Sequence, residues 1–227
     1  APSLVDAPAA RCTARAKSSA WFNARYNMAV GPLLTGAAHE LSSDVIQWWL
    51  TLQGPTSGVQ LQAIIQQLFT VLPSPTMWDP SRCRTCAVVG NSGRLKGSGH
   101  GLRIDAHDWV LRWVTQRGLH GEQLMAPPLP TQVLILSPAF LKYIHDNWTQ
   151  HHGRYPSTGF TALLFALHAC QQVSVFGFGA DSEGNWHHYW EKNRWSGAFR
   201  RTRVHDADIE FSLIERLAAE GRILFYK

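Results

Sequence analysis

One stretch, residues 86–107, constrains the fold of this chain more than any other: CAVVGNSGRLKGSGHGLRIDAH. Its short apolar run, residues 87–89, ends at the sequence GNSG, and three more glycines follow by residue 101. An apolar, β-branched run that stops at small residues predicts a buried strand leading into a ligand-binding loop. Glycines let backbone N–H groups approach a ligand, and such loops suit anions. The loop matches neither a Walker A sequence nor a GxGxxG fingerprint, so alone it is also explained by a strand ending in a flexible turn.

Strand and helix patterns alternate along the chain. Strands are predicted at 87–89, 108–113, 133–136, 173–176 and 223–226. Helices are predicted from Ser42 or Ser43 to 52, over 61–68, from Pro138 to 148, over 158–169, and from Asp206 or Asp208 to 220. This alternation predicts an α/β doubly wound sheet, whose ligands bind at the carboxyl ends of the strands. Residues 180–204 show no period and are expected to form a long functional loop or a lid.

Two further stretches accompany the glycine-rich one. YPSTG at 155–159 runs on to GFGAD at 177–181, and HHYW at 187–190 is followed by His205 and Glu210. With these three motifs in this order, the chain resembles the animal sialyltransferases, glycosyltransferase family 29, over most of residues 18–113 and 133–227. Within the family it is most similar to the beta-galactoside α-2,3-sialyltransferases that act on Galβ1-3GalNAc. The resemblance implies a Rossmann-like, mostly parallel sheet flanked by helices, a GT-A-like fold.

The resemblance also implies a reaction. Sialic acid would pass from CMP-N-acetylneuraminate to the 3-hydroxyl of galactose, with inversion and without a metal cofactor. Such a transfer needs a base for the hydroxyl and stabilisation of the departing phosphate, and histidine suits both tasks because its pKa lies near working pH. His205 is the candidate base, as the first residue of the family's His-x4-Glu motif, and His188 is the candidate for the phosphate. An exposed histidine at a helix start is the alternative for His205, while a metal pair at His187-His188 is disfavoured because neighbouring side chains on a strand point apart.

The motif match assigns the remaining site residues. The donor nucleotide would contact Asn91, Ser92, Ser157, Thr158, Gly159, Gly179 and His187. The acceptor sugar would contact Tyr155, Trp186 and Gln66. For each of these, packing or turn formation is the alternative explanation, and Gln66 could equally be a solvent-facing helix residue.

Composition bounds the class of protein. The chain has 227 residues, 45% of them apolar, which suits a single domain at 21–227 after a flexible lead-in at 1–20. The net charge is +5 and the pI about 9.2, which suits an acidic ligand. No run of Lys or Arg is present, so binding to nucleic acid is disfavoured. Most of the ten Trp residues are expected to pack in or near the core.

The four cysteines leave several options. Cys83 and Cys86 form a CxxC, which could bind zinc or carry out thiol redox chemistry, but no second pair completes a zinc set. An even, sparse count fits two disulfides in an oxidising compartment. The family resemblance implies that Cys86 pairs with Cys170, which leaves Cys12 for Cys83. Asn147-Trp-Thr is a sequon for N-glycosylation, consistent with a secretory setting.

No stretch of about 18 apolar residues exists, and no leader peptide is recognised. Family members are type II Golgi membrane proteins with a signal anchor, so we expect a portion in the Golgi lumen without its anchor, or a secreted soluble form. The expected partners are the nucleotide-sugar donor and galactose-terminated O-glycans or glycolipids, with the membrane reached only through that anchor. A homodimer is left open.

The chain departs from the family after Arg112, where it is expected to be shortened around 114–132. Val114 stands where the family has an Asn that holds the nucleotide, and Arg94 stands where relatives usually carry Asn. These departures motivate a second hypothesis, a non-catalytic relative that binds glycan or nucleotide, or an inactive shortened form. A metal-dependent hydrolase using some of the eleven histidines and a nucleic-acid binder complete the alternatives.

Overall fold

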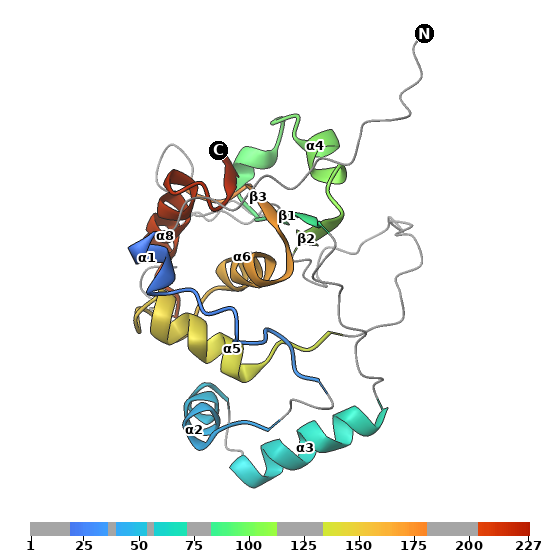
Figure 1. The fold of residues 1–227 in the computed structure, drawn as a ribbon, viewed down its shortest axis with the longest axis vertical. Coiled ribbons are helices and arrows are strands. Elements are labelled where there is room, and N and C mark those ends of the chain that lie inside the picture. The colour runs from blue at the N-terminus through green and yellow to red at the C-terminus, as the bar shows by residue number, and fades with distance from the viewer. Residues whose placement is uncertain (1–18, 36–39, 54–56, 72–82, 113–133, 181–203) are drawn as a thin grey trace.

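A four-stranded parallel sheet lies at the centre of the fold (Figure 1). The structure is a computed structural model that describes residues 19–35, 40–53, 57–71, 83–112, 134–180 and 204–227. The strands run in the order β2-β1-β3-β4, and every pairing between neighbours is parallel. Their bounds are β1 Thr85–Val89, β2 Trp109–Arg112, β3 Gln172–Phe176 and β4 Leu224–Tyr226. The predicted α/β class with a parallel sheet is confirmed.

The register places the carboxyl ends of three strands side by side. Val89, the last residue of β1, pairs with Arg112 of β2 and with Phe176 of β3. The two central strands are buried after their first residue, whereas β2 alternates between half-buried and exposed residues, as an edge strand does. The loops that follow these strands therefore start from the same edge of the sheet.

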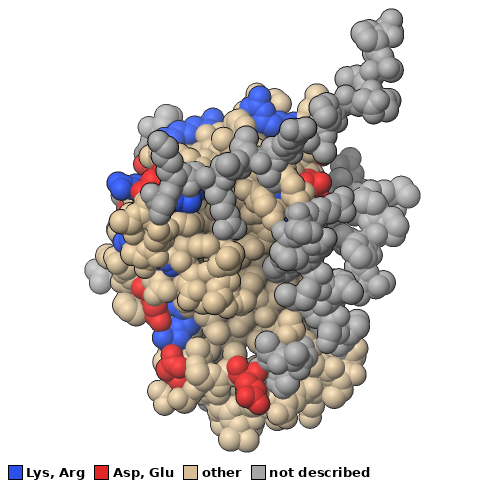
Figure 2. Space-filling view, in the orientation of Figure 1, with Lys and Arg blue, Asp and Glu red and all other residues tan. Residues whose placement is uncertain are grey.

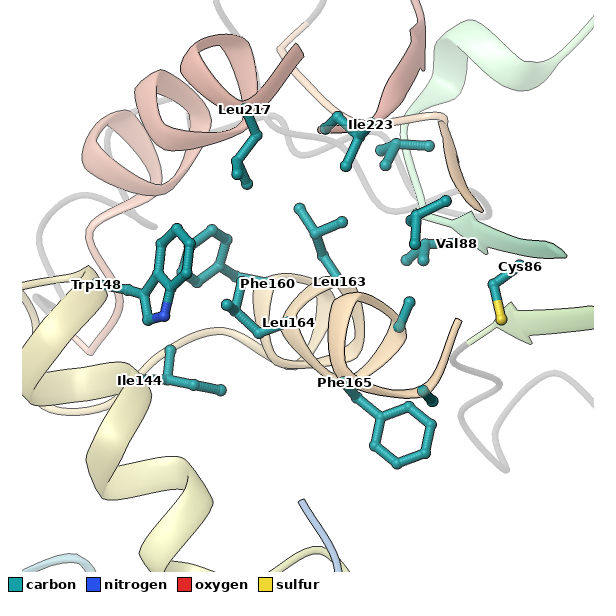
Figure 3. Packing of buried hydrophobic residues seen from close by; sticks show 14 of the residues in the cluster. Cys86, Val88, Ile144, Trp148, Phe160, Leu163, Leu164, Phe165, Leu217 and Ile223 are labelled. Atoms are coloured by element: carbon teal, nitrogen blue, oxygen red, sulfur yellow. The ribbon is translucent and has the colours of Figure 1, made fainter. Parts of the chain in front are cut away.

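Helix α6, Thr158–Ala169, covers one face of the sheet. Ser157 caps it, because its Oγ accepts a hydrogen bond from the backbone N–H of Phe160 at 3.1 Å. Apolar residues nearly all round this helix are buried, as expected for one that lies between two layers. In Figure 3, Leu163 points into the space bounded by Val88, Ile223 and Leu217, while Phe160 lies on the side of Trp148.

The opposite face of the sheet has a smaller core. Ala87, Val89 and Phe176 pack there against the partly buried Leu95, Ile104 and Tyr226. Leu95 belongs to a 3-10 turn, η1 Gly93–Leu95, and Ile104 to a short helix, α4 Gly101–Asp105. The sequence predicted only a loop here, so the glycine-rich stretch has more regular structure than expected.

On the α6 side of the sheet, helices follow one another at increasing distance from it (Figure 1). Beyond α6 come α5, then α2, then α3. The helices other than α4 and α6 are α1 Ala20–Asn23, α2 Ser43–Leu52, α3 Gly58–Val71, α5 Pro138–Tyr143 and α8 Ala207–Ala219, of which α8 packs beside β4. A π-helical turn, η3 Ile144–Trp148, continues α5. The predicted helices are confirmed, and α1 was missed because four residues are too few to show a period.

The prediction of a strand at 133–136 is wrong. In the described part of that run, only an isolated antiparallel bridge joins Leu136 to Leu33. Two backbone hydrogen bonds flank this bridge. The N–H of Leu34 donates to the carbonyl of Ile135 at 2.8 Å, and the N–H of Ser137 donates to the carbonyl of Pro32 at 3.0 Å. An apolar run does not by itself show which segment it pairs with, and this one pairs with the segment before α2 instead of joining the sheet.

The surface features are modest. On the face shown in Figure 2, Lys and Arg lie in separate groups with acidic and uncharged residues between them, so the net charge of +5 is not gathered into one continuous surface there. Within the described ranges, no helix has the length and apolar character needed to cross a membrane.

Candidate functional site

A cavity of about 520 Å³ opens at the carboxyl end of the sheet. Its described lining comes from the loop after β1, the end of β2, the start of α6, the loop after β3 and the start of α8. Seven of the predicted site residues line it: Asn91, Ser92, Ser157, Thr158, Gly159, Gly179 and His205. Segments separated by more than 100 residues in the sequence thus meet at one place, where the doubly wound fold is expected to bind its ligand.

The loops after β1 and β3 touch each other at the back of this cavity. The backbone N–H of Gly90 donates to the carbonyl of Phe176 at 2.8 Å, and that of Ser92 to the carbonyl of Gly177 at 2.9 Å. A Cβ atom on Gly90 would lie 2.4 Å from the carbonyl oxygen of Gly177, so a side chain there would force the loops apart. The glycine that ends the apolar run is therefore required by close backbone approach.

Phe178 is a pocket residue that the sequence reasoning missed. A Cβ on Gly90 would meet its ring at 2.9 Å, and a Cβ on Gly159 would meet it at 3.0 Å, so the ring lies between these two backbones. It offers an apolar face to the cavity. An aromatic residue between two glycines directly after a strand, as in Gly177-Phe178-Gly179, was the available signal.

His205 is held by a backbone carbonyl. Its Nδ1 lies 2.9 Å from the carbonyl oxygen of Tyr155, and the two rings meet edge to face with centroids 4.8 Å apart. A carbonyl oxygen only accepts hydrogen bonds, so Nδ1 carries the proton of the neutral ring. The basic nitrogen is then Nε2, the atom that could take a proton from a ligand.

A tight turn fixes the backbone of His205. Gly153 has φ of +74°, and a Cβ there would lie 3.0 Å from the carbonyl oxygen of Val204 and 3.1 Å from the Cα of His205. The next residue, Arg154, donates its N–H to the same Val204 carbonyl at 2.8 Å. Only glycine suits this position, both for its φ and for its contact with the residue next to the candidate base.

Glu210 lies in the wall of the cavity, one turn along α8 from its start. The residue is only 7% exposed, and its Oε1 accepts a hydrogen bond from the backbone N–H of Ser157 at 2.6 Å. Burial raises the pKa of Glu210 to about 7, helped by the negative charge of Asp206, while the bonds with Ser157 act in the opposite direction. A buried carboxyl with a raised pKa in the wall of a cavity, five residues from a candidate base, is a candidate functional group.

The cavity also has an apolar part. Leu111 at the end of β2 lines it, as do Leu134, Leu136 and Phe165. Leu134 and Leu136 are 44% and 38% exposed, so this part of the lining is accessible to a ligand. No sequence signal pointed to these residues, because apolar runs were interpreted as sheet or core.

The other predicted site residues are placed elsewhere or not described. Trp186, His187 and His188 lie outside the described residues, so their roles stay predictions. Gln66 is exposed on α3 and is not part of the described cavity lining. Asn147 is exposed, although the next two residues of its sequon are buried.

The cysteines are used in disulfides. Cys86 is bonded to Cys170, which confirms that predicted pair. Cys83 is also disulfide-bonded, and Cys12 lies outside the described residues. Neither cysteine of the CxxC is therefore a thiolate available to zinc. Within the described ranges, no group of three or more His, Cys, Asp or Glu residues could hold a metal ion.

Comparisons with known proteins agree on one family. The sequence model of glycosyltransferase family 29 (sialyltransferase) matches residues 33–117 and 114–222. A mouse protein named CMP-N-acetylneuraminate-beta-galactosamide-alpha-2,3-sialyltransferase 2 is 37% identical over 96% of this chain and 79% of its own length. The human protein of the same name numbered 1 is 38% identical, over 95% and 81% respectively.

Solved structures give the same result. A crystal structure of a mammalian sialyltransferase superposes with a TM-score of 0.73 at 35% identity, covering 92% of this chain and 94% of the other. A second structure of a mammalian sialyltransferase, in complex with Gal-beta-1-3GalNAc-ortho-nitrophenol, has a TM-score of 0.71 at 34% identity. The alignment with the mouse protein spans 275 positions, more than the whole chain contains, so that relative has residues with no counterpart here.

Proposed function

This chain belongs to glycosyltransferase family 29, the sialyltransferases, and from that membership we propose that it is an α-2,3-sialyltransferase. It transfers sialic acid from CMP-N-acetylneuraminate to the 3-hydroxyl of galactose in Galβ1-3GalNAc-type glycans. The observation that carries the proposal is the cavity at the carboxyl end of the sheet, which is lined by seven residues predicted from the family's motifs. The relatives' names and the acceptor analogue in the second solved structure give further support.

The proposed mechanism is a single displacement with inversion. The galactose 3-hydroxyl oxygen forms the new bond to the anomeric carbon of sialic acid while the bond from that carbon to the phosphate oxygen of CMP breaks. Nε2 of His205 takes the hydroxyl proton, and the released electron pair stays on the phosphate. The carbonyl of Tyr155 supports this role, because its bond to Nδ1 at 2.9 Å favours the tautomer with a basic Nε2.

The other assignments remain part of the proposal. Asn91, Ser92, Gly179 and the start of α6, residues 157–159, hold the donor nucleotide, together with His187. The imidazolium of His188 stabilises the departing phosphate. Tyr155, Trp186 and Gln66 contact the acceptor sugar. The N-terminus of α6 supports donor binding, because its free N–H groups face the same cavity as the glycine loop.

The compartment and chain organisation are proposed on similar grounds. The bond between Cys86 and Cys170 suits an oxidising compartment, and the family membership points to the Golgi lumen. Exposure of Asn147 is compatible with a glycan at its sequon. We propose a single catalytic domain over 21–227, shortened around 114–132. The family match falls into two parts, residues 33–117 and 114–222, and their junction at 114–117 supports that position.

The experiment is transfer of labelled sialic acid from CMP-N-acetylneuraminate to Galβ1-3GalNAc in the presence of EDTA. We expect turnover by the wild type, and a loss of roughly 10²- to 10⁴-fold in the His205→Ala variant, the usual range for removing a general base. His151→Ala is the matched control, because this histidine is 70% exposed and is not part of the described cavity lining. It should behave as wild type.

Three results would revise the proposal. Full turnover in His205→Ala would remove the assignment of the base. Loss of turnover with EDTA, restored by a divalent metal, would overturn metal independence. Binding of CMP without turnover on any acceptor would favour the non-catalytic relative, for which Val114 and the short segment are the motivation.

A further inference from the structure

Glu210 connects the two halves of the cavity wall. It lies on α8, five residues after His205, and its carboxylate reaches across to the backbone N–H of Ser157 at 2.6 Å. Ser157 in turn caps α6, whose first residues, Thr158 and Gly159, line the cavity. One hydrogen bond therefore joins the element that begins beside the candidate base to the element that begins at the donor-binding residues.

The surroundings of Glu210 contain few charges that could offset its own. Asp206, the N-cap of α8, adds negative charge, and His205 directly precedes that cap. The described first turn of α6 and the loop after β3 present no titratable side chain to the cavity, whereas Arg112 at the end of β2 lines it. His152 lies 3.5 Å from Asp206 and so acts on Glu210 indirectly. The ionised carboxyl is thus buried next to another carboxylate.

We propose that Glu210 is a positioning residue that holds the start of α6 in place relative to His205, and that the anionic donor binds best when this carboxyl has taken up a proton. The inference rests on the proposed function, because it assigns an anionic ligand to the cavity. The donor has a negative phosphate and a negative carboxylate, and an ionised Glu210 in the same wall repels both. The proton comes from solvent and leaves the bond from Ser157 intact, since a neutral carboxyl still accepts through its carbonyl oxygen.

The pKa of about 7 places this proton exchange in the neutral range. As the pH rises from 6 to 8, the protonated fraction falls and the apparent donor affinity falls with it. Because the apparent dissociation constant scales inversely with the competent fraction, the donor KM should rise up to about tenfold over this interval. The hydroxyl proton is taken by His205 and not by Glu210. The pH dependence caused by Glu210 should therefore appear in the donor KM and not in kcat.

The test compares Glu210→Gln with Glu210→Ala over pH 6 to 8. Glutamine keeps an oxygen that accepts from Ser157 but cannot ionise, so its donor KM should change less than about twofold while its kcat stays within about threefold of wild type. Alanine removes the bridge, and its kcat should fall at least about tenfold, as expected when a positioning contact is lost. Glu215→Gln is the matched control, because Glu215 lies on the same helix but pairs with Lys227 at the surface.

Calorimetry of CMP binding at pH 7, in two buffers of different ionisation enthalpy, gives a readout independent of turnover. Wild type and Glu215→Gln should take up more protons than Glu210→Gln, and the proton uptake of CMP itself cancels in this comparison. A wild type that transfers sialic acid with a flat donor KM and the same proton uptake as Glu210→Gln would overturn this inference alone. A wild type that neither binds CMP nor transfers sialic acid would overturn the proposed function, and the inference with it.

Discussion

The two ends of the parallel sheet are held in different ways. At the amino end, Cys86 and Cys170 join β1 covalently to the segment before β3. Asp108, just before β2, accepts from the backbone and the hydroxyl of Thr85 at 2.8 and 3.0 Å. Gln171 and Arg84 exchange backbone and side-chain bonds between the starts of β3 and β1. The amino end of β1 is therefore bonded directly to the amino ends of both of its neighbours, β2 and β3.

At the carboxyl end, the same three strands end at a cavity. The ties there are backbone contacts between glycine loops, and the side chains of Ser92, His205 and Glu210 face the space where a ligand would bind. The comparison teaches that stability and function are divided between opposite ends of the strands. Changes at the amino end should alter unfolding more than binding, and changes at the carboxyl end should alter both.

The disulfide gives the largest test of this division. Replacing Cys86 and Cys170 together by Ser should lower the free energy of unfolding by about 4 kcal/mol, because the bond closes a long loop in the unfolded chain. The two cysteines are 84 residues apart in the sequence. Urea unfolding followed by circular dichroism would measure the loss.

Under conditions where the variant remains folded, its affinity for CMP should stay within about threefold of wild type, because the carboxyl end is untouched. A variant that keeps full stability would show that the bonds of Asp108 and Gln171 suffice to tie the amino end. A variant that is folded but binds no CMP would show that the two ends are coupled.

Glu210 should produce the next largest effect, at the carboxyl end. Burial raises its pKa to about 7 from an ordinary value of 4.5, so the folded state disfavours the ionised form. The contribution of Glu210 to stability is therefore fully present below pH 4.5 and is lost as the pH rises through 7. Between pH 5 and 8, wild type should lose roughly 2 to 3 kcal/mol of unfolding free energy relative to Glu210→Gln, at about 1.4 kcal/mol for each pKa unit. Urea titrations at several pH values measure this difference, and a constant difference would contradict it.

Two glycines of the loop after β1 provide a matched pair. Gly90→Ala should cost about 1 to 3 kcal/mol of unfolding free energy, since its Cβ would lie 2.4 Å from the carbonyl of Gly177. Gly93→Ala should change stability by less than about 0.5 kcal/mol, because no atom lies within 4 Å of the added methyl. Gly90→Ala should also weaken CMP binding. Equal effects on stability would mean that the loops can move apart freely.

Much of the fold was predictable because the sequence periods are strong. Helix 158–169 was predicted with its cap, since Ser157 precedes a run in which nearly every apolar residue is buried. The strand at 133–136 was not, because apolar residues also pair outside the sheet, as Leu136 does with Leu33. The small helix α4 was not predicted, because the glycines before it and at its first residue favour a loop.

The lining of the cavity was predictable where motifs supply it and not where packing does. His205 and the residues around Ser157 were found through short polar motifs, and the structure brings them together in one cavity. Phe178 and Leu134 were missed, because an apolar side chain at a cavity has no local signature that differs from core. The bridge between Glu210 and Ser157 depends on contact across 53 residues, which no motif encodes.

The smallest effect should come from Arg84, at the amino end. Its guanidinium lies over the ring of Trp109 with Cζ 4.0 Å from the centroid, a cation–π contact between the starts of β1 and β2. Arg84→Met keeps the aliphatic stem and should cost about 0.5 to 1 kcal/mol of unfolding free energy. CMP affinity should not change. A double-mutant cycle with Trp109→Leu isolates the contact, and a coupling energy of zero would show that the disulfide and the bonds of Asp108 and Gln171 hold this end of the sheet without it.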